Sequence, residues 1–340
     1  MLKVGLVGYG FMGHMHADCY LASGEAKVAA VADIQSSRRD EAAAAFGCEV
    51  FDSLESLLDS VDVDIVDICL PTGLHESHAV LALERGKHTI CEKPMALTVE
   101  ACDRVIEAAG KSSAKAMVAH VIRFWPEYQV VKRIVDSGEI GAVQWVKAKR
   151  LSPLPMWSYE GWMIDPVRSG GAIFDMAIHD VDFIAHLIGP PGKITSIGGP
   201  MASGGDSVLS LGSDHANGAK SCVEVSFALP PGFPFTMGLL VVGERGTIRF
   251  DSSQTPALVV YPTSGGSYVP DVPKPGVGLA TKSAGNIADL GGYLNEIKYF
   301  LDCIKSDKTP DLVTLNDARE AVRTCLASKQ SLASGETIVL

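Results

Sequence analysis

Apolar runs alternate strictly with helix-like segments through the first 120 residues. The apolar runs, each long enough for one strand, cover residues 4–7, 28–32, 65–70, 89–91 and 116–119. The segments of helical composition between them cover residues 12–22, 37–46, 54–58, 75–85 and 99–109. Strands that are apolar throughout indicate a parallel sheet whose two faces are both covered by helices. The alternation therefore predicts a doubly wound α/β domain with right-handed crossovers.

The pattern changes after residue 120, where strand-like runs follow one another without intervening helices. The elements predicted in this part are helices over residues 127–137 and 171–188 and strands over residues 222–229, 236–242 and 247–250. A Gly-, Pro- and Ser-rich loop over residues 265–285 precedes two final helices, 289–305 and 315–334, the last capped by Thr314 or Asn316. We expect two domains, residues 1–121 and residues 122–340, the second an α+β domain with a mostly antiparallel sheet.

Composition narrows the classes of partner. The 340 residues contain 29 Lys and Arg against 40 Asp and Glu, a net charge of −11 at pH 7. An acidic chain without a basic run is a poor match for nucleic acid or an anionic membrane surface. No apolar stretch approaches the ~20 residues that span a bilayer, and the eight cysteines form no CxxC pair. We expect a cytoplasmic protein with reduced thiols, no metal site, and neither nucleic acid nor membrane as a partner.

Three glycines, Gly8, Gly10 and Gly13, lie where the first predicted strand meets the first predicted helix. In this context GxGxxG is typical of a dinucleotide-binding turn, in which the backbone approaches the pyrophosphate at a helix N-terminus. An acid, Asp33, follows at the end of the second strand, where it would accept hydrogen bonds from the ribose hydroxyls. The alternative is a purely structural corner between strand and helix.

The choice between NAD and NADP depends on the same carboxylate. Asp33 would repel a 2′-phosphate, which favours NAD. Arg38 and Arg39 could instead bind that phosphate, or could simply form a solvated first turn of the next helix. We expect NAD rather than NADP.

A second motif, Glu92–Lys93–Pro94, closes the strand at residues 89–91. Ligands of an open α/β sheet bind beyond the carboxyl ends of its strands, so Lys93 would point into that crevice. Its ammonium group could hydrogen-bond a substrate oxygen and stabilise alkoxide character. The alternative is a surface lysine beside a turn proline.

The helix predicted over residues 171–188 is apolar except for one narrow stripe. At ~100° per residue, the stripe contains Asp175, His179, Asp182 and His186. A solvated face usually carries Lys, Glu, Gln or Arg, whereas Asp and His one turn apart can form an acid–base pair. Metal ligation is the weaker hypothesis because only two ligands converge locally.

Other polar and aromatic residues are weaker candidates. His14 and His16 point to opposite sides of their helix and are not expected to share a metal ion. His78 is expected to be ordinary surface. A group of residues near the domain junction could wall a pocket for a sugar-like ring, or could simply pack: Arg123, Trp125, Met156, Trp157 and Trp162.

Taken together, the motifs resemble those of a known family. The chain carries, in order, Gly8-x-Gly10-x-x-Gly13, Pro71–His75, Glu92–Lys93–Pro94, Gly138–Gly141 and Gly170-Gly171-x-x-x-Asp175-x-x-x-His179-Asp180. This set resembles the glucose–fructose oxidoreductase, inositol dehydrogenase and rhizopine-catabolism (Gfo/Idh/MocA) oxidoreductases. The resemblance implies an N-terminal Rossmann domain and a C-terminal domain whose open sheet often forms the interface of a homodimer or homotetramer.

The resemblance also implies roles for individual residues. The catalytic residues would be Lys93, Asp175 and His179. The residues implied to contact the cofactor are Gly8, Gly10, Phe11, Met12, Gly13, Asp33, Arg38, Leu70, Pro71, Thr72, His75, Glu92 and Lys93. The resemblance implies that Lys93, Asp175 and His179 also contact substrate. Arg123 and Trp162 join them as candidate substrate contacts because of their place near the domain junction.

Three functions remain open at this point. The first is an NAD(P)-dependent dehydrogenase that acts on the CH–OH group of a cyclic polyol or sugar, with an inositol as the single best guess. The second is a glycoside hydrolase or epimerase that uses tightly held NAD. The third is a non-enzymatic NAD-binding regulator, which the presence of Lys93, Asp175 and His179 disfavours.

Overall fold

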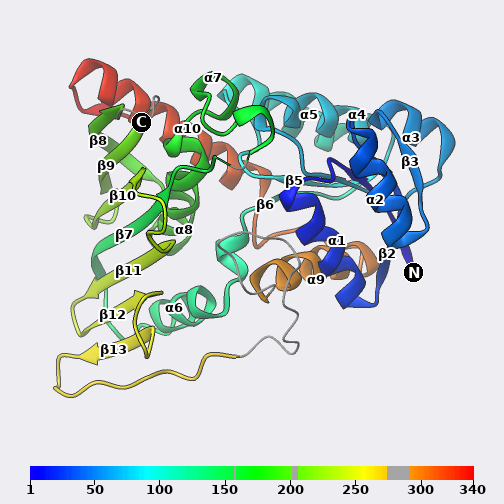
Figure 1. Ribbon diagram of the computed structural model, residues 1–340. Coiled ribbons are helices and arrows are strands. Elements are labelled where there is room, and N and C mark those ends of the chain that lie inside the picture. The colour runs from blue at the N-terminus through cyan, green and yellow to red at the C-terminus, as the bar shows by residue number, and fades with distance from the viewer. Residues whose placement is uncertain (157, 201–205, 274–290) are drawn as a thin grey trace. The chain divides into compact units, whose positions relative to one another are not determined.

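The computed structural model describes residues 1–156, 158–200, 206–273 and 291–340. As far as they are described, Met1–Trp125 and Pro275–Arg319 make one compact unit, here called the N-terminal unit. Pro126–Lys274 and Glu320–Leu340 make a second, here called the C-terminal unit. Figure 1 labels the helices and strands of both.

The N-terminal unit contains a six-stranded sheet in the order β3-β2-β1-β4-β5-β6. All its described pairings are parallel, with Val4–Val7 of β1 opposite Ile65–Ile68 of β4. The strands are β1 (Leu2–Val7), β2 (Ala26–Ala32), β3 (Glu49–Phe51), β4 (Ile65–Ile68), β5 (His88–Glu92) and β6 (Ala116–Ala119). The doubly wound parallel sheet predicted from the sequence is confirmed.

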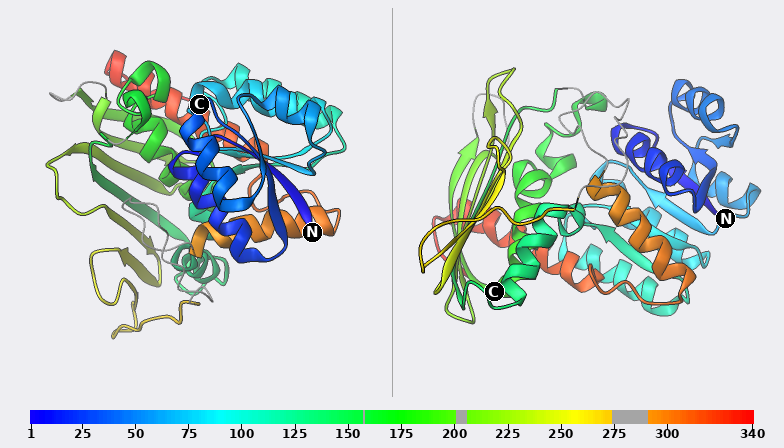
Figure 2. Two further views of the ribbon diagram at one scale, coloured as in Figure 1. Left: turned by 45° about the vertical axis from the view of Figure 1, so that its right-hand side comes forward. Right: turned by 90° about the horizontal axis from the view of Figure 1, so that it is seen from below.

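Helices cover both faces of this sheet (Figures 1 and 2). One face carries α1 (Phe11–Ser23), and α4 (His75–Glu84) packs beside α5 (Val99–Lys111) on the other. The remaining helices before residue 125 are α2 (Ser36–Phe46), α3 (Leu54–Ser60) and short 3-10 turns at Thr72–Leu74 and Val121–Phe124. Thr98 caps α5, accepting a hydrogen bond of 3.1 Å from the backbone N–H of Ala101.

Helix α9 (Gly291–Lys305) packs beside α1 and belongs to the N-terminal core. Its buried side chains include Leu294, Ile297, Phe300 and Leu301. Gly292 lets the helix approach Trp125, because a Cβ at that position would lie 2.1 Å from the indole. The core of this unit is therefore completed by residues far along the chain. The first two residues of the helix predicted over 289–305 lie outside the described range.

The C-terminal unit is built on an eight-stranded sheet in the order β13-β12-β11-β7-β10-β9-β8-β14. Every described pair is antiparallel except β7 with β10. The strands are β7 (Val143–Pro153), β8 (Pro191–Pro200), β9 (Asp206–His215), β10 (Lys220–Leu229), β11 (Thr236–Gly243), β12 (Gly246–Asp251), β13 (Leu258–Pro262) and β14 (Ile338–Val339). The mostly antiparallel sheet is confirmed.

Three helices pack on one face of this sheet: α6 (Pro126–Asp136), α8 (Ile178–Ile188) and α10 (Leu315–Ser334) (Figure 2). Thr314 caps α10, since its hydroxyl accepts the N–H of Asp317 at 3.1 Å. The remaining helical pieces are α7 (Pro166–Ser169), a 3-10 turn at Tyr159–Gly161 and a π-helical turn at Ile173–Ala177. Residues 265–273 of the predicted loop contain no helix or strand, and only Tyr268 forms an isolated bridge, with Val260. The rest of the predicted loop lies outside the described residues.

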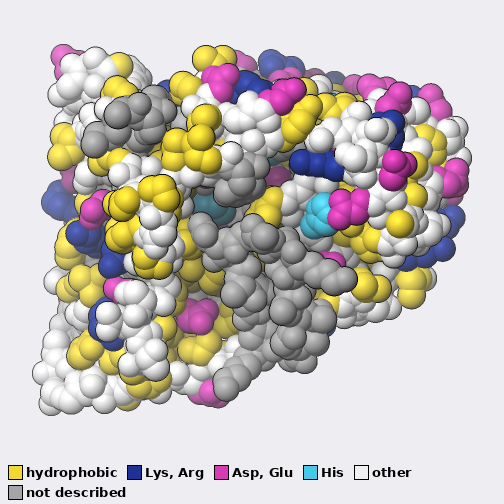
Figure 3. Space-filling view, in the orientation of Figure 1, with side chains coloured by type: hydrophobic (Ala, Val, Ile, Leu, Met, Phe, Trp, Pro, Cys, Tyr) yellow, Lys and Arg dark blue, Asp and Glu magenta, His cyan; other side chains and the backbone are white. Residues whose placement is uncertain are grey.

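On the face shown in Figure 3, basic and acidic side chains are interspersed over the N-terminal unit. Among the residues that the structure describes, no helix is long and apolar enough to cross a bilayer.

Candidate active site

Two positions of the glycine turn between β1 and α1, Gly8 and Gly13, have no room for a side chain. Gly8 has a φ of +88°, and a Cβ there would lie 2.5 Å from the carbonyl oxygen of Cys69. A Cβ on Gly13 would lie 2.1 Å from the carbonyl oxygen of Gly8. The strand, the turn and the first turn of α1 therefore approach each other more closely than any other residue type permits. This is the close backbone approach that a dinucleotide-binding turn requires.

Asp33 lies beside this turn at the carboxyl end of β2. Its Oδ2 accepts the backbone N–H of Tyr9 at 2.8 Å, and its Oδ1 accepts that of Gln35 at 2.8 Å. Asp33 is 7% exposed, and the two backbone N–H groups hold its carboxylate in place. An oriented carboxylate beside the turn fits the ribose hydroxyls of NAD and disfavours a 2′-phosphate.

The two arginines that follow Asp33 differ in their surroundings. Arg39 donates from Nη1 to the carbonyl oxygens of Asp33 at 2.7 Å and Ile34 at 3.1 Å. Arg38 lies closer to the turn: its Nη1 is 3.7 Å from Asp33 Oδ2, and a Cβ on Gly10 would lie 2.9 Å from the same nitrogen. Arg38 is therefore the arginine beside the predicted cofactor turn, and Arg39 stabilises the loop backbone.

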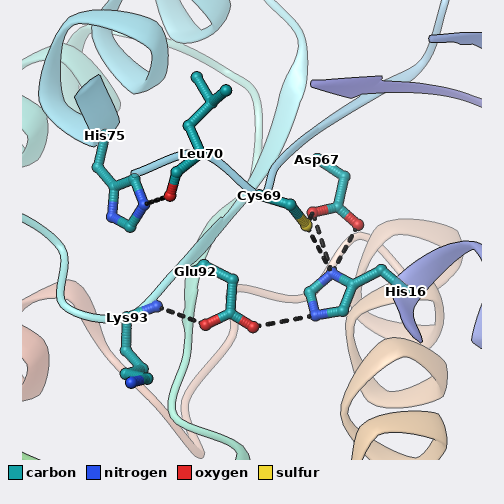
Figure 4. Close-up of polar contacts among 7 residues, drawn as sticks. All are labelled: His16, Asp67, Cys69, Leu70, His75, Glu92 and Lys93. Carbon is teal, nitrogen blue, oxygen red and sulfur yellow. Dashed lines mark hydrogen bonds and ion pairs between the residues drawn. The ribbon is translucent and has the colours of Figure 1, made fainter. Parts of the chain in front are cut away.

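Lys93 follows β5 at the same edge of the sheet. Its backbone N–H donates to Oε2 of Glu92 at 3.0 Å, and Oε1 of Glu92 lies 3.2 Å from Nε2 of His16 (Figure 4). Both oxygens of Glu92, a residue predicted to contact the cofactor, are thus engaged within the protein. The Lys93 side chain extends away from Glu92 in the same view.

His16 is the residue that sequence reasoning missed. Its ring, on α1, is fully buried between β4 and β5. Its Nδ1 lies 2.9 Å and 3.1 Å from the two carboxylate oxygens of Asp67 and 3.5 Å from Cys69 Sγ (Figure 4). An aspartate in the middle of the apolar strand Ile65–Ile68 is the sequence signal that could have indicated a buried partner.

The electrostatics of this cluster favour a charged imidazole. Burial disfavours the imidazolium, but the charge of Asp67 and the hydrogen bonds to Asp67 and Cys69 outweigh it and raise the pKa of His16 well above its usual range. Burial alone would raise the pKa of Glu92, yet His16 and Lys93 lower it. Both groups are therefore ionised at neutral pH.

His75 connects the segments that follow β4 and β5. Its Nε2 lies 2.7 Å from the carbonyl oxygen of Leu70, and its Nδ1 lies 2.7 Å from that of Pro94. Burial lowers the pKa of this ring, although both carbonyls favour its protonated form. Thr72, predicted beside the cofactor, is buried in the intervening 3-10 turn, with Leu70 and Pro71 partly exposed before it. Phe11 and Met12, the other cofactor candidates, begin α1 and are partly exposed.

The Asp/His stripe lies in the C-terminal unit and spans a π-helical turn. Asp175 lies within this turn, and His179 lies in the first turn of α8. Both are partly exposed, whereas Ile173, Phe174 and Ile178 around them are buried. Asp182 is buried and His186 is partly exposed. The π-helical turn departs from the regular α-helix that the sequence predicts, and such turns are frequent at functional sites.

A buried ion pair anchors this segment to the sheet. Arg150 of β7 donates from Nε and Nη2 to the two carboxylate oxygens of Asp180, at 3.1 Å and 3.0 Å. Burial raises the pKa of Asp180, and Arg150 opposes that shift. Because Asp180 adjoins His179, this bidentate pair fixes the part of α8 that presents His179.

The predicted pocket-wall residues have varied surroundings. Arg123 is 4% exposed, and its Nη1 donates to the Leu312 carbonyl at 2.7 Å and to Asp317 at 3.2 Å. Trp162 is partly exposed after the turn at Tyr159–Gly161. Trp125 packs against α9 and Met156 is exposed, while Trp157 lies outside the described residues. Within the N-terminal unit the structure places Asp33 beside the glycine turn, and within the C-terminal unit Asp175 and His179 lie four residues apart along one helical segment.

Comparison with known proteins gives the family. Residues 2–120 match the model of the Gfo/Idh/MocA oxidoreductase family with an NAD-binding Rossmann fold, and residues 128–249 match the C-terminal domain of that family. The chain is 33% identical over 191 residues to inositol 2-dehydrogenase of Rhizobium meliloti, a match that covers about half, 55%, of either chain. It is 27% identical to scyllo-inositol 2-dehydrogenase (NAD(+)) of Bacillus subtilis, over 100% of this chain and 96% of that one.

A solved structure extends the likeness over the whole chain. Levoglucosan dehydrogenase in complex with NADH and levoglucosan has a TM-score of 0.85 and 26% identity, over 99% of each chain. The matches to both domain models point to the same family as the solved structure does. The parallel sheet with its glycine turn and the carboxylate of Asp33 fit the NAD-binding domain of that family. The chain belongs to the Gfo/Idh/MocA family of oxidoreductases and is an NAD-binding enzyme of that family.

Proposed function

We propose that this protein is an NAD-dependent dehydrogenase that oxidises a secondary alcohol of a cyclic polyol or sugar, with an inositol as the leading substrate. Relatives named for inositols and for levoglucosan support this substrate class. The observation that carries the proposal is the pair Asp175 and His179, two partly exposed acid–base groups one turn apart on an otherwise buried helical segment.

The proposal assigns a role to each part of the chain. Residues 1–121 bind NAD through the glycine turn, Asp33, Arg38 and the segments after β4 and β5. Residues 122–340 bind the substrate, with Arg123 and Trp162 among the contacts, and form a homodimer or homotetramer through the sheet. The enzyme acts in the cytoplasm.

Three side chains carry the proposed chemistry. His179 accepts the proton of the substrate hydroxyl, and Asp175 orients the imidazole and favours its protonated form. The Lys93 ammonium donates a hydrogen bond to the same oxygen and stabilises its developing negative charge. NAD, when bound, supplies the hydride acceptor.

The direct test is reduction of NAD, followed by absorbance, with a panel of inositols, sugars and anhydrosugars. Lys93→Ala and His179→Ala should each lower kcat by about a hundredfold or more on the active substrate. Lys111→Ala, which removes an exposed lysine at the end of α5, and His78→Ala serve as matched controls and should retain turnover. Wild-type turnover in both active-site variants would contradict the assigned roles. Cleavage of a nitrophenyl glycoside without added NAD would favour the hydrolase hypothesis.

The same assay tests His179 by its dependence on pH. Oxidation should rise with pH as the imidazole loses its proton and becomes able to accept one from the substrate. A kcat/KM that stays flat between about pH 6 and 9 would contradict a titrating histidine base.

A further inference from the structure

Both ring nitrogens of the buried His16 face carboxylates that come from different strands. Asp67 of β4 contacts Nδ1, and Glu92 of β5 lies 3.2 Å from Nε2. A neutral imidazole has one N–H and would place a lone pair against one of the two anions, whereas the imidazolium carries a proton on each nitrogen, donates from Nδ1 to Asp67 and forms an ion pair with Glu92. The geometry is therefore that of a cation between two anions.

The groups around His16 agree with this charge state. The titratable neighbours of the ring and of the next helical turn are Asp67, Cys69, Cys91, Glu92, Cys19 and Tyr20, with Tyr293 and Glu296 from α9. Burial and the neighbouring carboxylates raise the pKa values of the thiols Cys19, Cys69 and Cys91, which keeps them neutral. The only cation of this set is His16.

The contacts continue from His16 to the segment that carries Lys93. Glu92 Oε2 accepts the backbone N–H of Lys93, while His75 contacts the carbonyl oxygen of Pro94. Two buried histidines thus hold the backbone on either side of Lys93: His16 acts through Glu92, as Figure 4 shows, and His75 acts through the carbonyl of Pro94. Neither His16 nor Asp67 belongs to the motifs from which the site was predicted.

We propose that His16 is a positioning residue: held between Asp67 and Glu92, it fixes the Glu92 carboxylate that accepts the Lys93 N–H, and so sets the backbone from which the Lys93 side chain extends. The catalytic importance of His16 rests on the proposed function of Lys93. The charge of His16 and its contacts with Asp67 and Glu92 are independent of that function and can be measured without substrate.

A bound cation is the alternative explanation of the cluster. Potential ligand atoms of His16, Asp67 and Cys69 lie within 4.8 Å of one another. Both oxygens of Asp67, however, lie at hydrogen-bond distance from the same ring nitrogen, which fits a donated N–H and leaves no lone pair on that nitrogen for a metal.

The first experiment determines the state of the ring in the substrate-free protein. Nitrogen-15 NMR of histidine-labelled protein, with His16 assigned by loss of its signals in His16→Gln, should show both ring nitrogens protonated at pH 7. Asp67→Asn should move the deprotonation of His16 to lower pH, whereas His78→Gln should leave it unchanged. A single neutral tautomer at pH 7, or one equivalent of bound metal per chain, would overturn the proposal.

The second experiment tests the connection to Lys93. His16→Gln and Asp67→Asn, checked for folding by circular dichroism, should lower kcat by about 10- to 100-fold and change the KM for NAD by less than about threefold. Glu92→Gln retains an acceptor for the Lys93 N–H, so its kcat should fall less than that of Glu92→Ala. His16→Gln should add no further loss in a Lys93→Ala background, because its effect passes through Lys93. If the losses in kcat of His16→Gln and Lys93→Ala multiplied in the double variant, the positioning role of His16 would be refuted.

A wild-type protein that is inactive on every substrate would refute the proposed function. The charge state of His16 measured by NMR would still hold.

Discussion

The Asp33 carboxylate accepts hydrogen bonds from the N–H groups of Tyr9 and Gln35. The same carboxylate is predicted to discriminate against NADP. In Asp33→Ser the repulsion of a 2′-phosphate disappears, and Arg38 stays beside the turn as a phosphate partner. We expect kcat/KM to fall for NAD and rise for NADP, changing their ratio by about a hundredfold. Steady-state kinetics with both cofactors measures this ratio.

Asp59→Ser is the matched control, because Asp59 is exposed and pairs only at the surface with Arg85. Its cofactor ratio should equal that of wild type. Equal losses with both cofactors in Asp33→Ser would mean that Asp33 only supports the loop.

At the level of single residues, the sequence predicted Gly8, Gly13 and Asp33 because their spacing along the chain is short and characteristic. The His16 cluster could not be found in this way. His16 and Asp67 lie 51 residues apart, and their contact exists only after β1, α1 and β4 have packed. The role of each predicted site residue remains a prediction that the variants above test.

Among the elements, the turn between β1 and α1 makes a sharp prediction about glycine. In Gly13→Ala the new Cβ would lie 2.1 Å from the Gly8 carbonyl oxygen, so the turn must open and NAD affinity should be lost. Gly110→Ala, in the last part of α5, meets nothing within 4 Å and should raise the free energy of unfolding by up to about 1 kcal/mol. NADH fluorescence and urea unfolding measure the two effects. Normal cofactor affinity in Gly13→Ala would contradict the role of the turn.

The anchoring of α8 on β7 makes a second prediction. Asp180→Ala leaves the buried Arg150 without its bidentate partner and should lower the free energy of unfolding by about 3–5 kcal/mol. Replacing both residues, Arg150→Met with Asp180→Leu, should recover much of that loss because no unpaired charge remains. Urea unfolding compares these variants with Glu224→Ala, which breaks a half-exposed pair between Lys147 of β7 and Glu224 of β10 and should cost less than about 1 kcal/mol. A loss in Asp180→Ala as small as in this control would contradict the anchoring.

Element prediction succeeded where burial follows a simple pattern along the chain. The five apolar runs correspond to β1, β2, β4, β5 and β6, whereas the three-residue β3 is too short to show a pattern. In the C-terminal unit β7, β8, β9, β13 and β14 were not predicted. β7 and β8 mix buried apolar residues with exposed polar ones, so they lack the continuous apolar run by which the other strands were found. The π-helical turn at Ile173–Ala177 depends on packing against neighbouring elements, and nothing in its sequence marks it.

For the molecule as a whole, the buried His16 gives stability a dependence on pH. The folded pKa is raised and the unfolded value is about 6.5, so the contribution of His16 is complete below about pH 6.5 and falls as pH rises toward the folded pKa. The difference in unfolding free energy between wild type and Asp67→Asn should therefore narrow between pH 6 and 9, with a slope of up to about 1.4 kcal/mol per pH unit. Urea unfolding across this range measures it, and a constant difference would contradict a charged His16.

At this largest scale the fold classes of the two sheets could be predicted from the sequence, but which helix completes which core could not. Residues 291–305 follow the antiparallel sheet in the chain, so chain order associates them with it. Their apolar side chains instead pack with β1, α1 and β6 of the N-terminal unit. Helical periodicity identifies an apolar face, but it does not identify the surface that this face covers.

The late position of α9 has a consequence for how the protein is made. A ribosome releases all six strands of the parallel sheet once residue 119 has emerged, yet α9 begins at residue 291. At roughly 5–20 residues per second the interval is ~9–34 s, during which the side of α1 that α9 later covers is open to solvent. The nascent chain therefore passes through a period in which its first sheet is complete and part of its core is exposed, and chaperones that bind apolar surface would act then.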